Sequence, residues 1–211
     1  MTTAPSATLL HTLTARDADG SPLTIRIASV LFFTALTAAA AQVSFALPFT
    51  QVPFTFQPTV VLLGGLVLGS RLACASQILY LMAGLAGLPV FAASVTLPPG
   101  ALRLLGPTGG YLLAYPLAAF VTGYLAERGF DRRYVTSMLA MLAGLVIIYA
   151  SGTLWLGLFA RTLSGSAAIG LNAAFAAGVY PFLIPDVIKL AAAAGIVPGV
   201  WRLIPPSAAG R

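Results

Sequence analysis

The chain has 211 residues, of which 59% are hydrophobic and only 8% are charged, and its mean hydropathy is +0.95. A soluble domain carries about a quarter charged residues, so this composition excludes a water-soluble globular fold. A helix needs about 20 apolar residues to cross a bilayer, and the chain is therefore predicted to be an all-α integral membrane protein with about six spans in one domain.

Residue types that support catalysis or metal binding are scarce. Cys74 is the only cysteine, which excludes an intrachain disulfide and a two-cysteine zinc site. His11, the only histidine, lies in the N-terminal segment, away from the apolar core. Lys189 is the only lysine and follows Ile188, so the chain has no P-loop. We expect no metal, no cofactor and no ATP hydrolysis by this chain.

Residues 1–24 are polar and are predicted to form a cytoplasmic tail without a cleaved signal peptide, because no short apolar run is followed by a cleavage site. The first span is predicted at residues 25–47. Ala35 and Ala39 have the small-xxx-small spacing that lets another helix approach closely. This pair is expected either to pack within the chain or to dock a partner protein in the membrane.

Three prolines interrupt the chain before the second apolar stretch, residues 59–68, so irregular backbone is expected at membrane depth. Such backbone is tolerated where it is buried in protein or lines a cavity. Thr55 and Gln57 are therefore candidates for polar contacts with a ligand. The alternative is that both side chains satisfy the backbone groups that the prolines leave free.

The third span is predicted at residues 72–88, and residues 89–108 form the longest irregular connection. Loops of this length in a compact protein are typically lids or binding loops. Phe91 is a candidate to cover an apolar ligand ring. Arg103 is a candidate to meet a carboxylate, or else to extend toward the membrane interface.

The fourth span, residues 109–126, follows the run GPTGG. Backbone amides at such a helix start, around Gly109, suit an anion or a carbonyl oxygen, although the run is equally compatible with a tight turn. Pro116 is expected to kink or hold this span.

The fifth span is predicted at residues 134–159 and the sixth at residues 167–196. Pro181 and Pro185 predict a kink or a break in the sixth span, which would free backbone groups close to the charged residues that follow.

The most informative stretch holds Asp186 and Lys189 inside an apolar run. Their spacing of three places both side chains on one helical face. An ionised group at membrane depth costs at least about 2.5 kcal/mol, so it normally faces a partner, a cavity or a ligand. The pair is therefore either a neutralising structural pair or part of a polar ligand site, and the two roles are compatible.

The distribution of arginines predicts the orientation. With a cytoplasmic N-terminus, eight arginines fall on the cytoplasmic side and two, Arg103 and Arg161, fall outside. This positive-inside bias predicts cytoplasmic termini, a cytoplasmic C-terminal tail at residues 197–211 and an external loop between spans three and four. The net charge of +6 is then topological and does not indicate nucleic-acid binding.

Four motifs, VPFTFQ, YLMAGLAGLPVFA, GPTGGYLLAYPLAAFVTG and IPDVIK, stand in an order and spacing that resemble the BioY family of bacterial biotin transporters. The resemblance covers residues 25–195. It implies a six-helix, substrate-binding S component of an energy-coupling factor (ECF) transporter in the bacterial cytoplasmic membrane. Its partners would be biotin, a transmembrane coupling subunit (the T component) and two ABC-type ATPases, which agrees with the missing P-loop.

The resemblance also implies a set of biotin-binding residues. Asp186 would accept hydrogen bonds from the ureido group, and Lys189 or Arg103 would meet the carboxylate, while Lys189 is also suited simply to hold Asp186. The chain departs from the family's first motif at Phe56 and Pro58. The complete implied set is Thr55, Gln57, Tyr80, Phe91, Arg103, Gly109, Tyr111, Asp186 and Lys189.

In the implied mechanism, the external loop closes over biotin and the chain reorients against the coupling subunit, with Ala35 and Ala39 of the first helix as the contact. An S component for another vitamin and a stand-alone carrier are the near alternatives. An intramembrane enzyme is disfavoured because Asp186 is the only acid expected at membrane depth. The sequence shows neither the polar rings of a channel nor the inverted repeat of an ion-coupled carrier.

Overall fold

The computed structural model describes residues 8–14, 22–93, 97–98, 100–160 and 169–204. Most of these residues are helical, and two short strands form a hairpin. Arg16, Arg161 and Arg211, which entered the prediction of orientation, lie outside the described residues. The elements in chain order are α1 (Leu9–Thr14), α2 (Pro22–Gln42), β1 (Ser44–Phe45), β2 (Phe54–Thr55), α3 (Gln57–Leu68), α4 (Ser70–Leu85), α5 (Leu102–Leu105), α6 (Gly109–Leu125), the π-helix η1 (Ala126–Phe130), α7 (Tyr134–Leu158), α8 (Leu171–Gly178), α9 (Tyr180–Ala194) and α10 (Ile196–Leu203).

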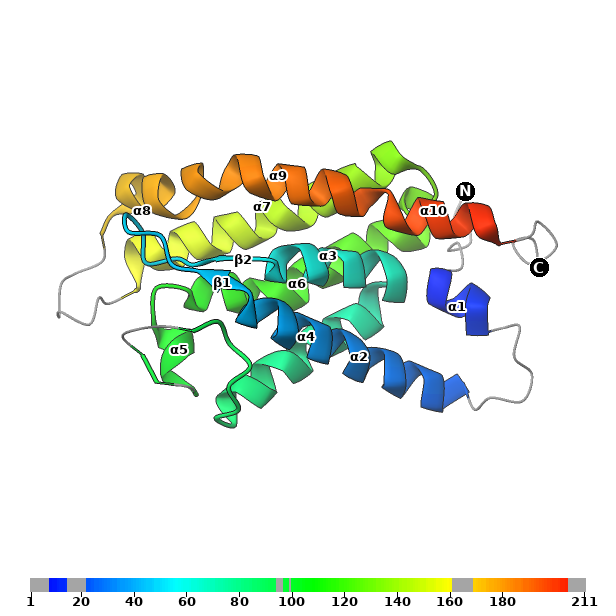
Figure 1. The fold of residues 1–211 in the computed structure, drawn as a ribbon, viewed down its shortest axis with the longest axis horizontal. Coiled ribbons are helices and arrows are strands. Elements are labelled where there is room, and N and C mark those ends of the chain that lie inside the picture. Colours follow the sequence, from blue (N-terminus) through cyan, green and yellow to red (C-terminus); the bar gives the residue numbers. More distant parts are fainter. Residues whose placement is uncertain (1–7, 15–21, 94–96, 99, 161–168, 205–211) are drawn as a thin grey trace.

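The helices form an elongated bundle (Figure 1). Helices α7 and α9 run along its long axis, and α10 continues the line of α9 toward the end at which α1 lies. The opposite end carries α8, α5 and the β1–β2 hairpin. The two ends of the bundle therefore differ in structure, with one end irregular and the other made of helix ends and short turns.

The described part of the chain has four helices that are long and apolar enough to cross a membrane, Leu23–Gln42, Gly109–Phe130, Tyr134–Leu158 and Tyr180–Leu203. The prediction of a mostly helical chain with long apolar helices is thus confirmed. Helices α3 and α4 have 12 and 16 residues, which is short for an independent span. The count of six spans, the external loop and the orientation stay predictions.

Close helix contacts depend on glycines at the centre of the bundle. Helix α6 packs against α3, α4 and α7. A Cβ atom added at Gly144 of α7 would lie 2.2 Å from Leu62 of α3, and one added at Gly65 would lie 2.9 Å from the backbone oxygen of Ala119. At Gly144 the side chain of Leu62 fills the space that a Cβ atom would take, and at Gly65 the backbone of α6 itself lies close to α3.

A tight turn joins α3 to α4. Gly69 has a φ of 80°, a left-handed conformation that favours glycine. Glu127 of η1 accepts hydrogen bonds from the backbone nitrogen and the hydroxyl of Ser70, at 2.7 and 2.8 Å. A carboxylate at the start of a helix satisfies its free amides and its dipole, so this bond fixes α4 to η1.

The structure places helix boundaries differently from the proline pattern. Helix α6 continues through Pro116, and α9 continues through Pro185. The break near the predicted site lies upstream, at Val179, and Pro181 falls in the first turn of α9, where a backbone N–H is not needed. The helical region also extends beyond residue 196, because α10 reaches Leu203, and α2 ends at Gln42, before the hairpin begins.

The packing at Gly123 gives a stability prediction. A Cβ atom there would lie 2.4 Å from the backbone carbon of Gly69 and 2.5 Å from the nitrogen of Ser70. Because backbone atoms move less easily than a side chain to relieve a clash, Gly123→Ala should lower the free energy of unfolding by about 1–3 kcal/mol. The purified variant is expected to show a lower midpoint of thermal unfolding. Gly199→Ala is the control, since nothing lies within 4 Å of its Cβ position. Equal midpoints for the two variants would contradict this account.

Candidate functional site

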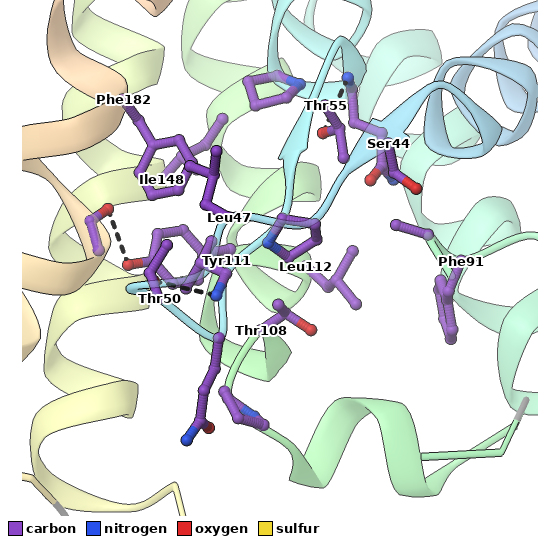
Figure 2. A pocket seen from close by; sticks show the side chains of 18 of the residues that line it. Ser44, Leu47, Thr50, Thr55, Phe91, Thr108, Tyr111, Leu112, Ile148 and Phe182 are labelled. Atoms are coloured by element: carbon purple, nitrogen blue, oxygen red, sulfur yellow. Dashed lines mark hydrogen bonds between the residues drawn. The ribbon is translucent and has the colours of Figure 1, made fainter. Parts of the chain in front are cut away.

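A cavity of about 650 Å³ lies at the irregular end of the bundle (Figure 2). Its walls come from the hairpin, the connection that leads into α5, and helices α6, α7 and α9. Most of the surrounding side chains are apolar, with a few polar groups among them. The lining residues are Ser44, Ala46, Leu47, Thr50, Gln51, Val52, Pro53, Thr55, Gln57, Pro58, Phe91, Ala92, Ala93, Leu97, Arg103, Pro107, Thr108, Tyr111, Leu112, Tyr115, Ile148, Tyr149, Gly178, Phe182 and Asp186.

The β1–β2 hairpin forms one wall of the cavity. Ser44 pairs with Thr55 and Phe45 with Phe54 in antiparallel register. The Thr50 hydroxyl, in the loop between the strands, donates a hydrogen bond of 2.8 Å to the carbonyl of Ala177 in α8. The irregular backbone that the prolines predict is therefore present, and it lines a cavity.

A buried ion pair borders this wall. Asp186 is 5% exposed, and its Oδ1 lies 2.5 Å from Lys189 Nζ. Its Oδ2 accepts a hydrogen bond of 2.7 Å from the hydroxyl of Tyr149 in α7. Both carboxylate oxygens therefore have a donor, which is the condition for keeping a buried charge ionised. Asp186 also lines the cavity, so it faces both its partners and the open space.

Lys189 turns away from the cavity toward the hairpin. Its Nζ donates a hydrogen bond of 2.6 Å to the carbonyl of Thr55 and lies 4.1 Å from the centre of the Phe54 ring. Lys189 is not among the residues that line the cavity. In this arrangement its charge holds Asp186 and the second strand together.

Gln57 and Tyr80 form a second polar contact behind the wall. Gln57 Nε2 donates a hydrogen bond of 2.6 Å to the Tyr80 hydroxyl, which in turn donates to the carbonyl of Val90 at 3.1 Å. The Tyr80 ring meets Phe91 edge to face, with centroids 5.4 Å apart. Gln57 and Phe91 line the cavity, whereas Tyr80 is fully buried and supports them.

Arg103 is buried within the protein, with 9% exposure. Its Nη1 donates to the carbonyl of Ala92 at 2.7 Å, and its Nε donates to that of Pro98 at 3.2 Å. Burial lowers the pKa of the guanidinium, and the nearby Tyr80 acts in the opposite direction. An arginine stays protonated at neutral pH, so Arg103 places a positive charge at the cavity wall.

Tyr111 and Gly109 have different roles at the start of α6. Tyr111 lines the cavity, and its hydroxyl donates to the carbonyl of Gly178 at 3.1 Å (Figure 2). Gly109 is absent from the lining, and a Cβ there would lie 1.8 Å from the carbonyl oxygen of Leu104. The Trp155 indole donates to the carbonyl of Gly106 at 2.9 Å. The GPTGG run thus forms a packed turn in this structure.

Several lining residues have no counterpart in the sequence-based set. Tyr149 is the most consequential, because it binds the carboxylate of Asp186 directly. A tyrosine inside an apolar span needs a hydrogen-bond partner, and this requirement is the sequence feature that points to Tyr149 as a polar contact. Thr50, Leu112, Ile148 and Phe182 also line the cavity, and only the packing of the hairpin and helices identifies them.

Residues 9–206 match the model of the BioY family. The chain belongs to the BioY family. It is 41% identical to a probable biotin transporter BioY of Pyrococcus horikoshii over 79% of this chain and 90% of that protein. It is 38% identical to the biotin transporter BioY of Thermotoga maritima over 77% of this chain and 87% of that protein. The expectation of a transport protein rather than an enzyme is confirmed.

The fold resembles a solved structure, that of the S-component for biotin from an ECF-type ABC transporter. The two match with a TM-score of 0.75 over 92% of this chain and 100% of that one, at 22% sequence identity. At this identity the likeness establishes the fold alone.

Proposed function

We propose that this chain captures biotin as the S component of an ECF-type transporter in the cytoplasmic membrane. The observation that carries the proposal is the cavity itself. It combines one ionised acceptor, Asp186, with apolar walls and one buried cation, Arg103. A volume of about 650 Å³ falls within the range of small-molecule sites.

The chemistry of biotin fits these three features. Its ureido N–H groups need an acceptor, and the Asp186 carboxylate is held in place by Tyr149 and Lys189. Its thiophane ring and valerate chain need apolar walls, which Leu112, Ile148 and Phe182 provide.

Its carboxylate needs a cation. Of the two cations that the sequence offered, Arg103 lines the cavity and Lys189 does not, so we assign the carboxylate to Arg103. Thr55, Gln57, Phe91 and Tyr111 complete the proposed pocket. Tyr80 and Lys189 are proposed to support it from behind.

The proposal includes a topology and partners. Helices α3 and α4 are counted as the second and third of six spans, and both termini are cytoplasmic. Ala35 and Ala39 are exposed on α2, where close approach of a T component is sterically open. That subunit would act with two ABC-type ATPases, because this chain has no P-loop.

The first test is radiolabelled biotin binding to the detergent-purified protein. Asp186→Asn removes the acceptor charge, and binding is expected to weaken about tenfold to a hundredfold. Glu127→Gln is the control, because that acid caps α4 away from the cavity and should leave biotin affinity unchanged. Riboflavin and thiamine are measured in parallel. No saturable biotin binding by folded wild-type protein, or tighter binding of another vitamin, would refute the assignment.

The two candidate cations can be separated with a neutral ligand. Arg103→Met should weaken binding of biotin about tenfold or more, but should leave binding of biotin amide, which lacks the carboxylate charge, nearly unchanged. Lys189→Met should weaken both ligands alike, since it releases Asp186 and the hairpin. The reverse pattern would move the carboxylate to Lys189.

The docking role of α2 predicts a loss of transport without a loss of binding. Ala35→Leu combined with Ala39→Leu should block close helix approach and reduce biotin uptake by cells at least about tenfold. Ala150→Leu, at an exposed alanine of α7, is the matched control. Unchanged uptake by the double variant would place the partner elsewhere, or would indicate a carrier that acts alone.

A further inference from the structure

Exposed positive charge gathers at one end of the bundle. The exposed arginines of the described residues are Arg26, Arg71, Arg128, Arg133 and Arg202. Arg128 and Arg202 lie in the last turns of the candidate spans Gly109–Phe130 and Tyr180–Leu203, and Arg133 directly precedes the span Tyr134–Leu158. Three candidate spans therefore meet an arginine at the same end. At the cavity end, Arg103 is the only arginine among the described residues, and it is buried.

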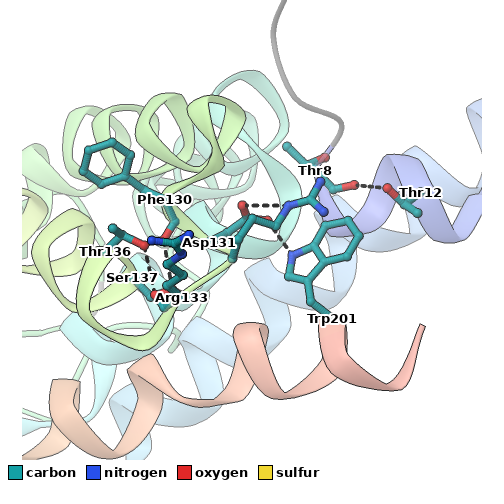
Figure 3. Close-up of polar contacts among 9 residues, drawn as sticks. Thr8, Thr12, Phe130, Asp131, Arg133, Thr136, Ser137 and Trp201 are labelled. Carbon is teal, nitrogen blue, oxygen red and sulfur yellow. Dashed lines mark hydrogen bonds and ion pairs between the residues drawn. The ribbon is translucent and has the colours of Figure 1, made fainter. Parts of the chain in front are cut away.

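Two hydrogen bonds bring these segments together. The bond between Ser70 and Glu127 joins the start of α4, where Arg71 lies, to η1, where Arg128 lies. The Trp201 indole donates to Asp131 Oδ2 at 2.7 Å, which joins α10 to the turn before α7 (Figure 3). Arg71, Arg128, Arg133 and Arg202 thus belong to one connected region, which we call the arginine surface.

The acids of this region are occupied within the protein. Glu127 binds Ser70, and Asp131 is fully buried against Trp201. Among the described residues, the ion pair at this end joins Asp131 to Arg132, whose guanidinium also lies 3.5 Å from the centre of the Trp201 ring. None of the four members of the arginine surface has an ion-pair partner within the described part of the chain. The side chains of all four are exposed.

We propose that the arginine surface binds the phosphate groups of anionic phospholipids. Guanidinium groups match phosphate with two parallel hydrogen bonds, which makes arginine suited to this ligand. The position at the ends of the apolar spans puts the charges at headgroup depth rather than in free solution. Tyr124 and Tyr134 are exposed at the same level, as is typical of side chains at a membrane interface.

Contacts with Tyr124 fix the position of the Arg128 guanidinium at this surface. The guanidinium lies 3.3 Å from the centre of the Tyr124 ring and donates to both the carbonyl and the hydroxyl of Tyr124. This stacking fixes one face of the group and leaves the residue exposed. A fixed guanidinium loses less conformational entropy when it binds.

The test is native mass spectrometry of the full chain in detergent, titrated with phosphatidylglycerol or with phosphatidylcholine of the same acyl chains. The wild type should prefer phosphatidylglycerol. The triple variant Arg71→Gln, Arg133→Gln, Arg202→Gln should lose about a hundredfold in affinity for that lipid, since each arginine contributes about 1 kcal/mol at a membrane surface. Replacing the same three residues with lysine should retain much of the preference.

Arg26→Gln is the matched control, because Arg26 is exposed on α2, outside the connected region. Because Arg26 is not joined to the other arginines, its replacement should lower the affinity for phosphatidylglycerol much less than any replacement within the arginine surface. Biotin binding serves as a readout of folding for every variant. If the triple variant fails to fold, the three single variants replace it, each expected to lose about fivefold. Equal affinity of the wild type for both lipids, or equal losses in the arginine-surface and Arg26 variants, would overturn the proposal.

Discussion

The structure depends on keeping one ion pair satisfied inside an apolar bundle. Asp186 Oδ1 and Lys189 Nζ lie 2.5 Å apart. Asp186 also accepts a hydrogen bond from the hydroxyl of Tyr149, and Lys189 donates one to the carbonyl of Thr55. An unpaired charge at this depth would be too costly to retain. The pair therefore joins α9 to α7 and to the hairpin, and so holds three walls of the cavity in register.

The two ends of the molecule use charge in opposite ways. At the cavity end, Asp186 and Arg103 are buried and hydrogen-bonded within the protein, so little charge reaches the surface. At the other end, Glu127 and Asp131 form hydrogen bonds within the protein, and the exposed charged residues there are arginines. Between the two ends, glycines let α6 pack closely against α3 and α7.

The candidate site was partly predictable. Thr55, Gln57, Phe91, Arg103, Tyr111 and Asp186 were singled out from the sequence, and all of them line the cavity. Polar or aromatic residues beside prolines and loops in an apolar chain stand out because irregular backbone needs them. Lys189, Tyr80 and Gly109 were proposed with them but stand behind the lining. Sequence spacing predicts that two side chains share a helix face, but it does not predict which residues of other helices contact that face. For this reason the sequence did not identify Tyr149.

By itself, the sequence determined that the chain is a helical membrane protein with a charged pair in its last long apolar segment, because composition and spacing alone decide where helices are apolar and which residues share a face. The bounds of the individual helices, the position of the break at Val179, just before Pro181, and the direction in which each polar side chain points were decided by tertiary structure. These features depend on contacts between segments far apart in the chain, such as Lys189 with Thr55, which no local pattern encodes.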